Sequence, residues 1–136
     1  MNDEQYMRRA LELAKRAQDE GEVPIGAVLV LEEEIIGEGW NRPIAASDPT
    51  AHAEIQAMRA AALARRNYRL TGASLYVTLE PCEMCVGAMF HARIARAVYG
   101  ATDPKKQVLK NQVVLQGGVL AAECGAILSK FFAAKR

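Results

Sequence analysis

The sequence predicts an α/β fold with a mixed, five-stranded sheet that carries helices on both faces. Segments with apolar residues at helical spacing alternate along the chain with short apolar runs of strand length. Such alternation is typical of a sheet packed between layers of helices. The chain shows no internal repeat, low-complexity stretch or linker, so we expect residues 1–136 to form a single domain.

The start of the chain predicts a helix followed by a β-hairpin. Apolar residues between Tyr6 and Ala17 recur at helical spacing, and Gly21 is placed to end that helix. The apolar runs 25–31 and 34–40 then flank the acidic stretch "EEE", which is most simply a hairpin turn.

A turn-rich loop, "RPIAASDPT", separates the hairpin from the other elements. Asp48 or Thr50 can cap the helix that follows, near residues 50–66. The remaining elements are a strand at 73–79, a helix at 81–94 that begins at Pro81, a strand at 95–101, a weaker strand at 111–116 and an amphipathic helix at 119–136. Residues 102–112 alone join the last two strands, which is close to the minimum for a parallel crossover, so the direction of the fifth strand stays open.

Composition argues against several classes of protein. The net charge is +1, so any binding to nucleic acid must come from local patches. Three cysteines, two of them in Cys-x-x-Cys, favour a metal site in a reducing compartment over a disulfide framework. The first residues hold no apolar signal core, and no run reaches the roughly 18 apolar residues of a membrane span. We therefore expect a cytoplasmic protein with no membrane partner.

Two short motifs indicate a metal site. Cys82 and Cys85 are three residues apart at a predicted helix start, where they project from one face and where exposed N–H groups lower the pKa of thiols. With His52 they make three ligands for a tetrahedral zinc and leave one position open, as in catalytic sites. Taken alone, each motif has an ordinary explanation: a redox pair or core packing for the cysteines, and a capping residue for the histidine.

Glu54 follows His52 by two residues, about 200° around a helix, so the two side chains are not expected to bind one ion side by side. Zinc held by two thiolates and one imidazole is formally uncharged and acidifies its water less than a three-histidine site would. A carboxylate that takes the proton of that water makes up the difference. We therefore expect Glu54 to be catalytic and His52 to bind the metal.

The combined pattern H-x-E…P-C-x-x-C is the signature of zinc-dependent nucleoside deaminases. More closely, the chain resembles the bacterial tRNA adenosine deaminases (TadA type). The matching stretches are "EVPIGAVLV", "IIGEGWNRPI", "DPTAHAEI", "NYRLTGASLYVTLEPCEMCVGAMFHARI", "VYGATDPK" and "GGVLAAECGAILSKFF". Compared with that family, the segment after residue 103 is shortened, which bears on the choice of substrate.

The resemblance implies a cytidine-deaminase-like three-layer fold with one zinc per chain, held between two helix starts by His52, Cys82 and Cys85. It implies hydrolytic deamination of adenosine to inosine in RNA, at the wobble position of a tRNA anticodon loop, by a homodimer. Glu54 would carry the proton.

Four further residues are expected to contact the substrate. By resemblance, Asn41 would hold the sugar or the base, the Ala53 backbone would touch the purine edge, and Asp103 would lie beside the substrate backbone. Phe132, with Phe131 and the basic residues near the C-terminus, is a candidate for stacking on bases of the anticodon loop or another single-stranded nucleic acid.

Two alternatives stay open. The first is a deaminase for another base: guanine, cytosine, or adenine or cytosine in single-stranded DNA. The polynucleotide cytidine deaminases carry Ser-Trp-Ser before Pro-Cys, whereas this chain has residues 78–80, "TLE". The second is a zinc-stabilised RNA-binding module without catalysis, which Glu54 argues against. Cys124 is expected in the core, and the role of His91 stays open between packing, surface and an interface.

Overall fold

The computed structural model describes residues 1–104 and 113–135. The chain forms, in order, α1 (Asp3–Asp19), β1 (Gly26–Leu31), β2 (Glu34–Trp40), α2 (Ala53–Arg65), β3 (Ser74–Leu79), α3 (Glu83–His91), β4 (Arg96–Ala101), β5 (Val114–Gln116) and α4 (Ala121–Ala134). Within these described residues, no helix has the length and apolar content needed to cross a membrane.

The sheet is mixed and has the strand order β2-β1-β3-β4-β5. β1 pairs antiparallel with both β2 and β3, whereas β3, β4 and β5 run parallel to one another. The fifth strand is therefore parallel, which answers the question that the short connection left open. Residues 105–112, most of that connection, lie outside the described residues, as do the first two residues of the predicted strand 111–116.

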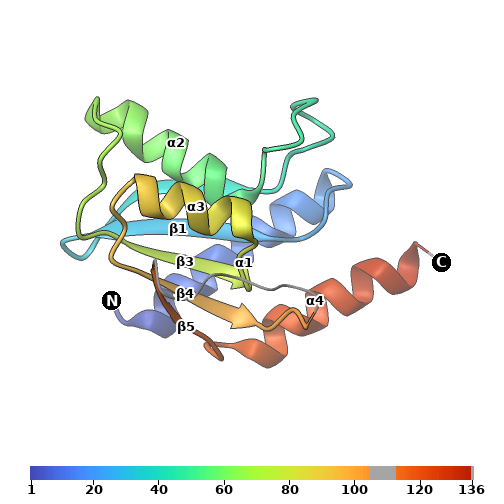
Figure 1. The fold of residues 1–136 in the computed structure, drawn as a ribbon. Helices are drawn as coiled ribbons and strands as arrows, with labels where there is room; N and C mark the ends of the chain where they lie inside the picture. Colours follow the sequence, from blue (N-terminus) through green and yellow to red (C-terminus); the bar gives the residue numbers. More distant parts are fainter. Residues whose placement is uncertain (105–112, 136) are drawn as a thin grey trace.

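Helices cover both faces of the sheet (Figure 1). α2 and α3 lie on one face, over a core that includes Leu75 and Val77; α1 and α4 lie on the other, over a core that includes Tyr76. Successive side chains of β3 thus point to opposite faces, as the two-residue period of a strand requires. The predicted three-layer α/β fold is confirmed.

The acidic hairpin turn is also confirmed. Glu32 and Glu33 have φ angles of 52° and 67°, the left-handed conformation of a two-residue turn whose twist matches the flanking strands.

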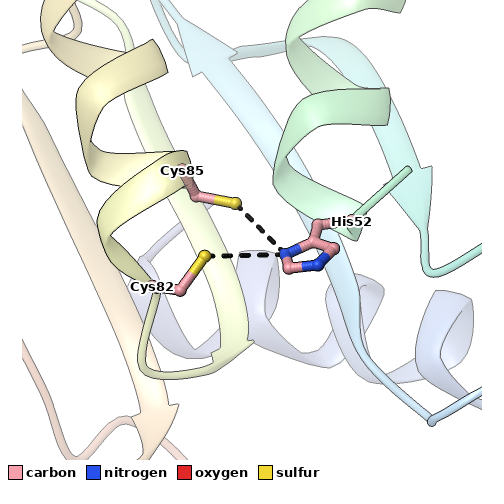
Figure 2. Close-up of side chains that lie close together, drawn as sticks. All are labelled: His52, Cys82 and Cys85. Carbon is pink, nitrogen blue, oxygen red and sulfur yellow. Dashed lines mark hydrogen bonds between the residues drawn. The ribbon is translucent and has the colours of Figure 1, made fainter. Parts of the chain in front are cut away.

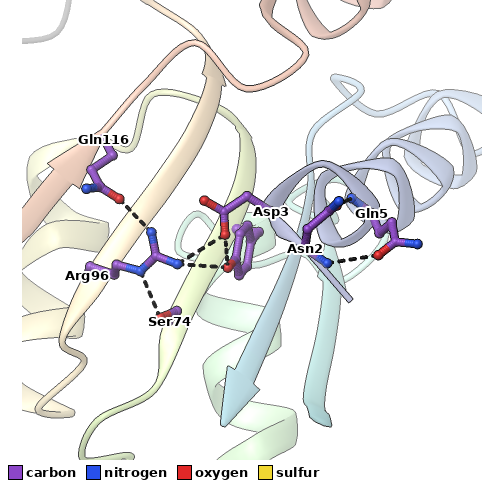
Figure 3. Close-up of polar contacts among 7 residues, drawn as sticks. Asn2, Asp3, Gln5, Ser74, Arg96 and Gln116 are labelled. Carbon is purple, nitrogen blue, oxygen red and sulfur yellow. Dashed lines mark hydrogen bonds and ion pairs between the residues drawn. The ribbon is translucent and has the colours of Figure 1, made fainter. Parts of the chain in front are cut away.

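α1 begins earlier than its apolar pattern suggests. The side chain of Asn2 accepts a hydrogen bond from the Gln5 backbone N–H at 2.9 Å, and the Gln5 side chain accepts one from the Asn2 N–H at 2.8 Å (Figure 3). This capping box satisfies two donors at the helix start.

A hydrogen-bonded arginine ties the N-terminus to three strands. The guanidinium of Arg96 donates to the side chains of Ser74 (3.2 Å), Gln116 (2.5 Å) and Asp3 (3.1 Å) (Figure 3). It also donates to the hydroxyl of Tyr76, which in turn donates to Asp3 at 2.6 Å. The hydrogen bond from Tyr76, aided by Arg96, lowers the pKa of Asp3. The network joins α1 to β3, β4 and β5.

Close packing places α2 directly on β2. A Cβ atom at Gly39 would overlap backbone atoms of Ala53 and Ala57, so a residue larger than glycine there would displace the helix. The first turn of α2 is thereby set against the sheet.

Two predicted helix starts are wrong. Neither Asp48 nor Thr50 caps α2, whose N-cap is His52, because Asp48 accepts instead from the N–H and hydroxyl of Thr50. α3 has Cys82 as its N-cap, so its first helical residue lies two positions after Pro81. α3 also ends before residue 94, since Arg93 adopts a left-handed conformation with φ of 65°.

Candidate active site

The site lies where two helices begin side by side on one face of the sheet. His52 is the N-cap of α2 and Cys82 is the N-cap of α3, both with extended backbone. The two helices start at the same end of the sheet, so residues thirty positions apart in sequence come together (Figures 1 and 2). Cys85, one turn into α3, completes the group.

The distances fit a tetrahedral zinc. His52 Nδ1 lies 3.6 Å from the Sγ of Cys82 and 3.6 Å from the Sγ of Cys85 (Figure 2). With Zn–S of about 2.3 Å and Zn–N of about 2.0 Å, a tetrahedral angle separates sulfur from nitrogen by about 3.5 Å. Both nitrogen–sulfur distances therefore suit zinc ligation, all three donor atoms lie within 4.8 Å of one another, and Nδ1 is the nitrogen that would bind the ion.

The surroundings of the two thiols shift their pKa values in opposite directions. A hydrogen bond from Cys85, together with one from His52, lowers the pKa of Cys82 to about 3, against the opposing effect of burial. The hydrogen bond to Cys82 and burial raise the pKa of Cys85. Zinc, when bound, would require both sulfurs as thiolates, so Cys85 would give up its proton on metal binding.

Metal ligands among the described residues number three, and no fourth histidine, cysteine or carboxylate joins the cluster there. Cys85 is fully buried, whereas His52 and Cys82 are partly exposed. Three protein ligands with access from one side are the arrangement of catalytic rather than structural zinc.

Glu54 lies beside the cluster and outside it. It sits in the first turn of α2 with 4% of its surface exposed. Its charge and a hydrogen bond add to the causes that raise the pKa of Cys85, after the bond to Cys82 and burial. A buried carboxylate next to a ligand thiol is well placed to exchange protons with a molecule at the open side of the site.

The other predicted substrate residues lie in different places. Asn41 and Ala53 are buried and in contact: Asn41 Oδ1 accepts from the Ala53 N–H at 2.8 Å. The backbone N–H of Asp103 donates to the carboxylate of Glu80 at 2.9 Å, next to the loop that carries Cys82. Phe132 is 49% exposed on α4, on the opposite face of the sheet from the zinc ligands.

Glu80 is a site residue that the sequence reasoning missed. Its carboxylate is buried, and its own backbone N–H donates to the carbonyl of Ala101 at 2.9 Å. It therefore fastens the end of β4 to the metal-binding loop. An acidic residue immediately before Pro-Cys was the available signal.

Cys124 and His91 lie in contrasting environments, one buried and one exposed. Cys124 is fully buried against Gly100, where a Cβ would overlap its Sγ, so its place in the core is confirmed. His91 is exposed at the end of α3, with its ring 5.7 Å from that of Phe90. Lys105, Lys106 and Lys110, which form a basic cluster in the sequence, lie outside the described residues.

Comparison with known proteins bears on the same residues. The cytidine and deoxycytidylate deaminase zinc-binding region matches residues 1–101, a range that holds all three ligands and Glu54. This chain belongs to that deaminase family. The predicted family membership and the zinc cofactor are confirmed.

Relatives match this deaminase over nearly its whole length. A tRNA-specific adenosine deaminase of Haemophilus influenzae is 50% identical over 147 residues, covering 98% of this chain and 85% of the relative. The solved structure of a tRNA:A34 deaminase, studied for A-to-I editing at the wobble position, superposes with a TM-score of 0.85 at 42% identity, covering 91% of this chain and 99% of the other. A guanine deaminase structure from Bacillus subtilis has a TM-score of 0.71 at 41% identity, covering 75% of this chain and 66% of the other.

Proposed function

We propose that this deaminase hydrolyses adenosine to inosine in tRNA, at the wobble position of the anticodon loop. The tetrahedral spacing of His52, Cys82 and Cys85, with buried Glu54 beside them, is the observation that supports the chemistry. Relatives that are tRNA-specific adenosine deaminases match nearly end to end, whereas the guanine deaminase structure matches three quarters of the chain.

The reaction adds water at C6 of the purine and releases the amino group as ammonia. Zinc, when bound, supplies Lewis-acid activation of water near neutral pH. The carboxylate of Glu54 carries one proton of the attacking water to N1 of the purine, and then carries the proton of the new C6 hydroxyl to the amino nitrogen. That nitrogen then leaves as ammonia, and the water oxygen becomes the carbonyl oxygen of inosine. Because Glu54 is buried, its proton passes to the substrate rather than to bulk water.

Substrate contacts are assigned to Asn41, Ala53, Asp103 and Phe132. Since Asn41 and Ala53 are joined by a hydrogen bond, we expect them to meet the nucleoside as one unit. Glu80 holds the backbone of Asp103 at the edge of the same loop that carries Cys82. Phe132 is half exposed and free to stack on a base further along the anticodon loop.

We also propose a homodimer that forms across the outer faces of α2 and α3. A groove of about 360 Å³ runs between these helices and is lined mainly by apolar residues: Ile55, Met58, Arg59, Ala62, Tyr68, Leu70, Ala88, His91 and Ala92. Phe90 is exposed at its side. Residues 86–90 of α3 read "VGAMF". Val86 and Met89 are buried in the core, so Gly87, Ala88 and Phe90 are left to meet a second copy.

We place the protein in the cytoplasm as a single domain over residues 1–136. Two of its three free cysteines are needed as metal ligands, and a reducing compartment keeps such thiols from forming disulfides.

Incubation with defined substrates tests the proposed function. Zinc-loaded protein is mixed with an RNA anticodon hairpin, the DNA hairpin of the same sequence, free guanine and free cytosine, and the products are identified by mass spectrometry. Inosine in the RNA hairpin supports the proposal. Conversion of guanine alone, or of the DNA hairpin alone, would instead indicate a deaminase for another base or for single-stranded DNA. Full zinc content with no product from any base would point to a non-catalytic RNA-binding module.

A further inference from the structure

Glu22 is a buried carboxylate with no place in the chemistry described so far. It follows α1 and is 2% exposed. Its two oxygens accept hydrogen bonds from consecutive backbone N–H groups, those of Ile44 (3.2 Å) and Ala45 (2.8 Å). A buried charge is costly unless it is hydrogen-bonded, and here its partners belong to a surface loop. The position of that loop is thus set by a group in the interior.

The loop, residues 42–50, has a defined conformation. Its base is closed by the hydrogen bond from the Arg42 N–H to the Ala51 carbonyl at 2.9 Å. Its tip is a single tight turn, in which the N–H groups of Ala46 and Asp48 donate to the carbonyls of Arg42 and Pro43. The N–H groups at the start of that turn are the ones that Glu22 binds.

Ile44 is the side chain that this turn presents to solvent, with 74% of its surface exposed. It lies two residues from Arg42, hence at most about 7 Å of backbone away. Arg42 is bonded to Ala51, the neighbour of the zinc ligand His52. Figure 1 shows the loop projecting at the end of the sheet where α2 and α3 begin. An exposed isoleucine is therefore held on a loop of fixed conformation that leads directly to the zinc ligand His52.

We propose that Ile44 is the apolar contact for the base adjacent to the reacting adenosine, and that Glu22 is a positioning residue for it. The inference rests on the proposed function, because it needs a polynucleotide substrate. Unstacked bases of single-stranded RNA are recognised by stacking on aromatic or arginine side chains, because every base offers a flat apolar face. Aliphatic side chains such as isoleucine pack against the same face when they insert beside a base. A contact that is already fixed in the free protein loses less conformational freedom on binding than a mobile one.

A double-mutant cycle, which combines substitutions of Ile44 with removal of a neighbouring base from the RNA, provides the test. KM and kcat are measured for wild type, Ile44→Ser and Ile44→Phe on an RNA hairpin and on hairpins with an abasic site on either side of the adenosine. On the intact hairpin, Ile44→Ser should raise KM about five- to tenfold with kcat within about twofold, and Ile44→Phe should stay near wild type. On the abasic hairpin that removes the contacted base, wild type and Ile44→Ser should become equal.

Leu63→Ser is the matched control, since Leu63 is 79% exposed and lies at the far end of α2. Its KM should not change. Glu22→Gln keeps one acceptor and should raise KM less than Ile44→Ser, with unchanged zinc content. An Ile44→Ser variant that matches wild type on the intact hairpin overturns the inference, as does equal loss on intact and abasic substrates. Wild type that is inactive on every hairpin refutes the proposed function, and the inference with it.

Discussion

The side-chain oxygen of Asn41 accepts a hydrogen bond from the backbone N–H of Ala53, 2.8 Å away, at the start of the helix that carries the zinc-binding histidine. Asn41 follows β2 directly, so the contact fastens α2 to the end of the strand on which it packs. The Ala53 N–H is one of the backbone donors at a helix start that lack a partner within the helix. The N-cap residue of α2 makes no capping hydrogen bond with its side chain, so Asn41 provides the acceptor. The residue expected to meet the substrate is thus also part of the scaffold.

Asn41→Ala should therefore lower stability as well as activity. Loss of a capping acceptor in a buried position should reduce the free energy of unfolding by about 1–2 kcal/mol. Urea unfolding of the zinc-loaded protein measures this loss. Asn41→Asp keeps an acceptor and is the control, because it should retain most of the stability. An unchanged unfolding free energy in Asn41→Ala would contradict the structural part of this role.

Glu54→Ala should separate metal binding from catalysis. The variant is expected to keep full zinc content, because Glu54 lies outside the ligand cluster. Activity on the RNA hairpin should fall by about 10²- to 10⁴-fold, the range for loss of general acid–base catalysis. Elemental analysis and single-turnover kinetics check the two parts. Release of zinc, or unimpaired deamination, would show that the assigned role is wrong.

His52→Ala is expected to lose zinc and activity together. It removes the ligand that lies 3.6 Å from both sulfurs and leaves two cysteines that cannot complete a three-ligand site. Zinc content after dialysis against trace metal, compared with Glu54→Ala, measures the difference. Full zinc content in the His52→Ala protein would mean that another residue binds the ion.

The ion pair of Arg9 and Glu38 should make stability depend on pH in the acid range. Arg9 donates two hydrogen bonds to Glu38, at 2.6 and 2.9 Å, and this bonding is the main cause of the lowered pKa of Glu38. A carboxyl whose pKa is lower in the folded state stabilises the fold fully above its ordinary value, 4.5, and loses that contribution as pH falls through the folded pKa. The pair is partly exposed, so it contributes about 0.5–1 kcal/mol.

Glu38→Gln should therefore lower the unfolding free energy at pH 7 and leave it close to wild type at pH 3. Urea unfolding at several pH values gives both curves. Glu12→Gln is the control, since Glu12 is more exposed and meets Arg9 through one contact of 3.2 Å. If the unfolding free energies of wild type and Glu38→Gln differed by the same amount at every pH, the ion pair would not be the source of the pH dependence.

The proposed dimer is tested by charge in the α2–α3 groove. Ala88→Arg puts a cation into a mainly apolar surface and should convert a dimer to a monomer at micromolar concentration, as measured by sedimentation. Val114→Arg, at an exposed site on β5, should leave the mass unchanged. A wild-type protein that sediments as one chain would refute the dimer itself.

Spacing and residue chemistry were sufficient to predict the metal ligands. Cys82 and Cys85 share a helix face by local geometry, and few residue types other than histidine can complete a zinc site with them. The hairpin turn was readable because its acidic residues interrupt two apolar runs. Both features depend on residues that are close together in the sequence, so they can be predicted from the sequence alone.

Contacts between segments that are distant in the sequence could not be predicted in this way. The bonds of Asn41 to Ala53 and of Glu22 to Ile44 and Ala45 join segments that no periodic pattern relates. The start of α2 was misplaced for this reason, since the distant Asn41, rather than a capping residue of the preceding loop, accepts from its first N–H group. The direction of β5 stayed open because its connection has a length that permits either arrangement.

The zinc ligands also have a consequence for the unfolded chain. His52 and Cys82 are thirty residues apart, and one ion bound to both closes a loop that contains all of α2 and β3. A covalent cross-link that closes a loop of this length stabilises a protein by about 3–4 kcal/mol, because it restricts the conformations open to the denatured chain. As long as it stays bound, the ion thus acts like a reversible cross-link between the starts of α2 and α3.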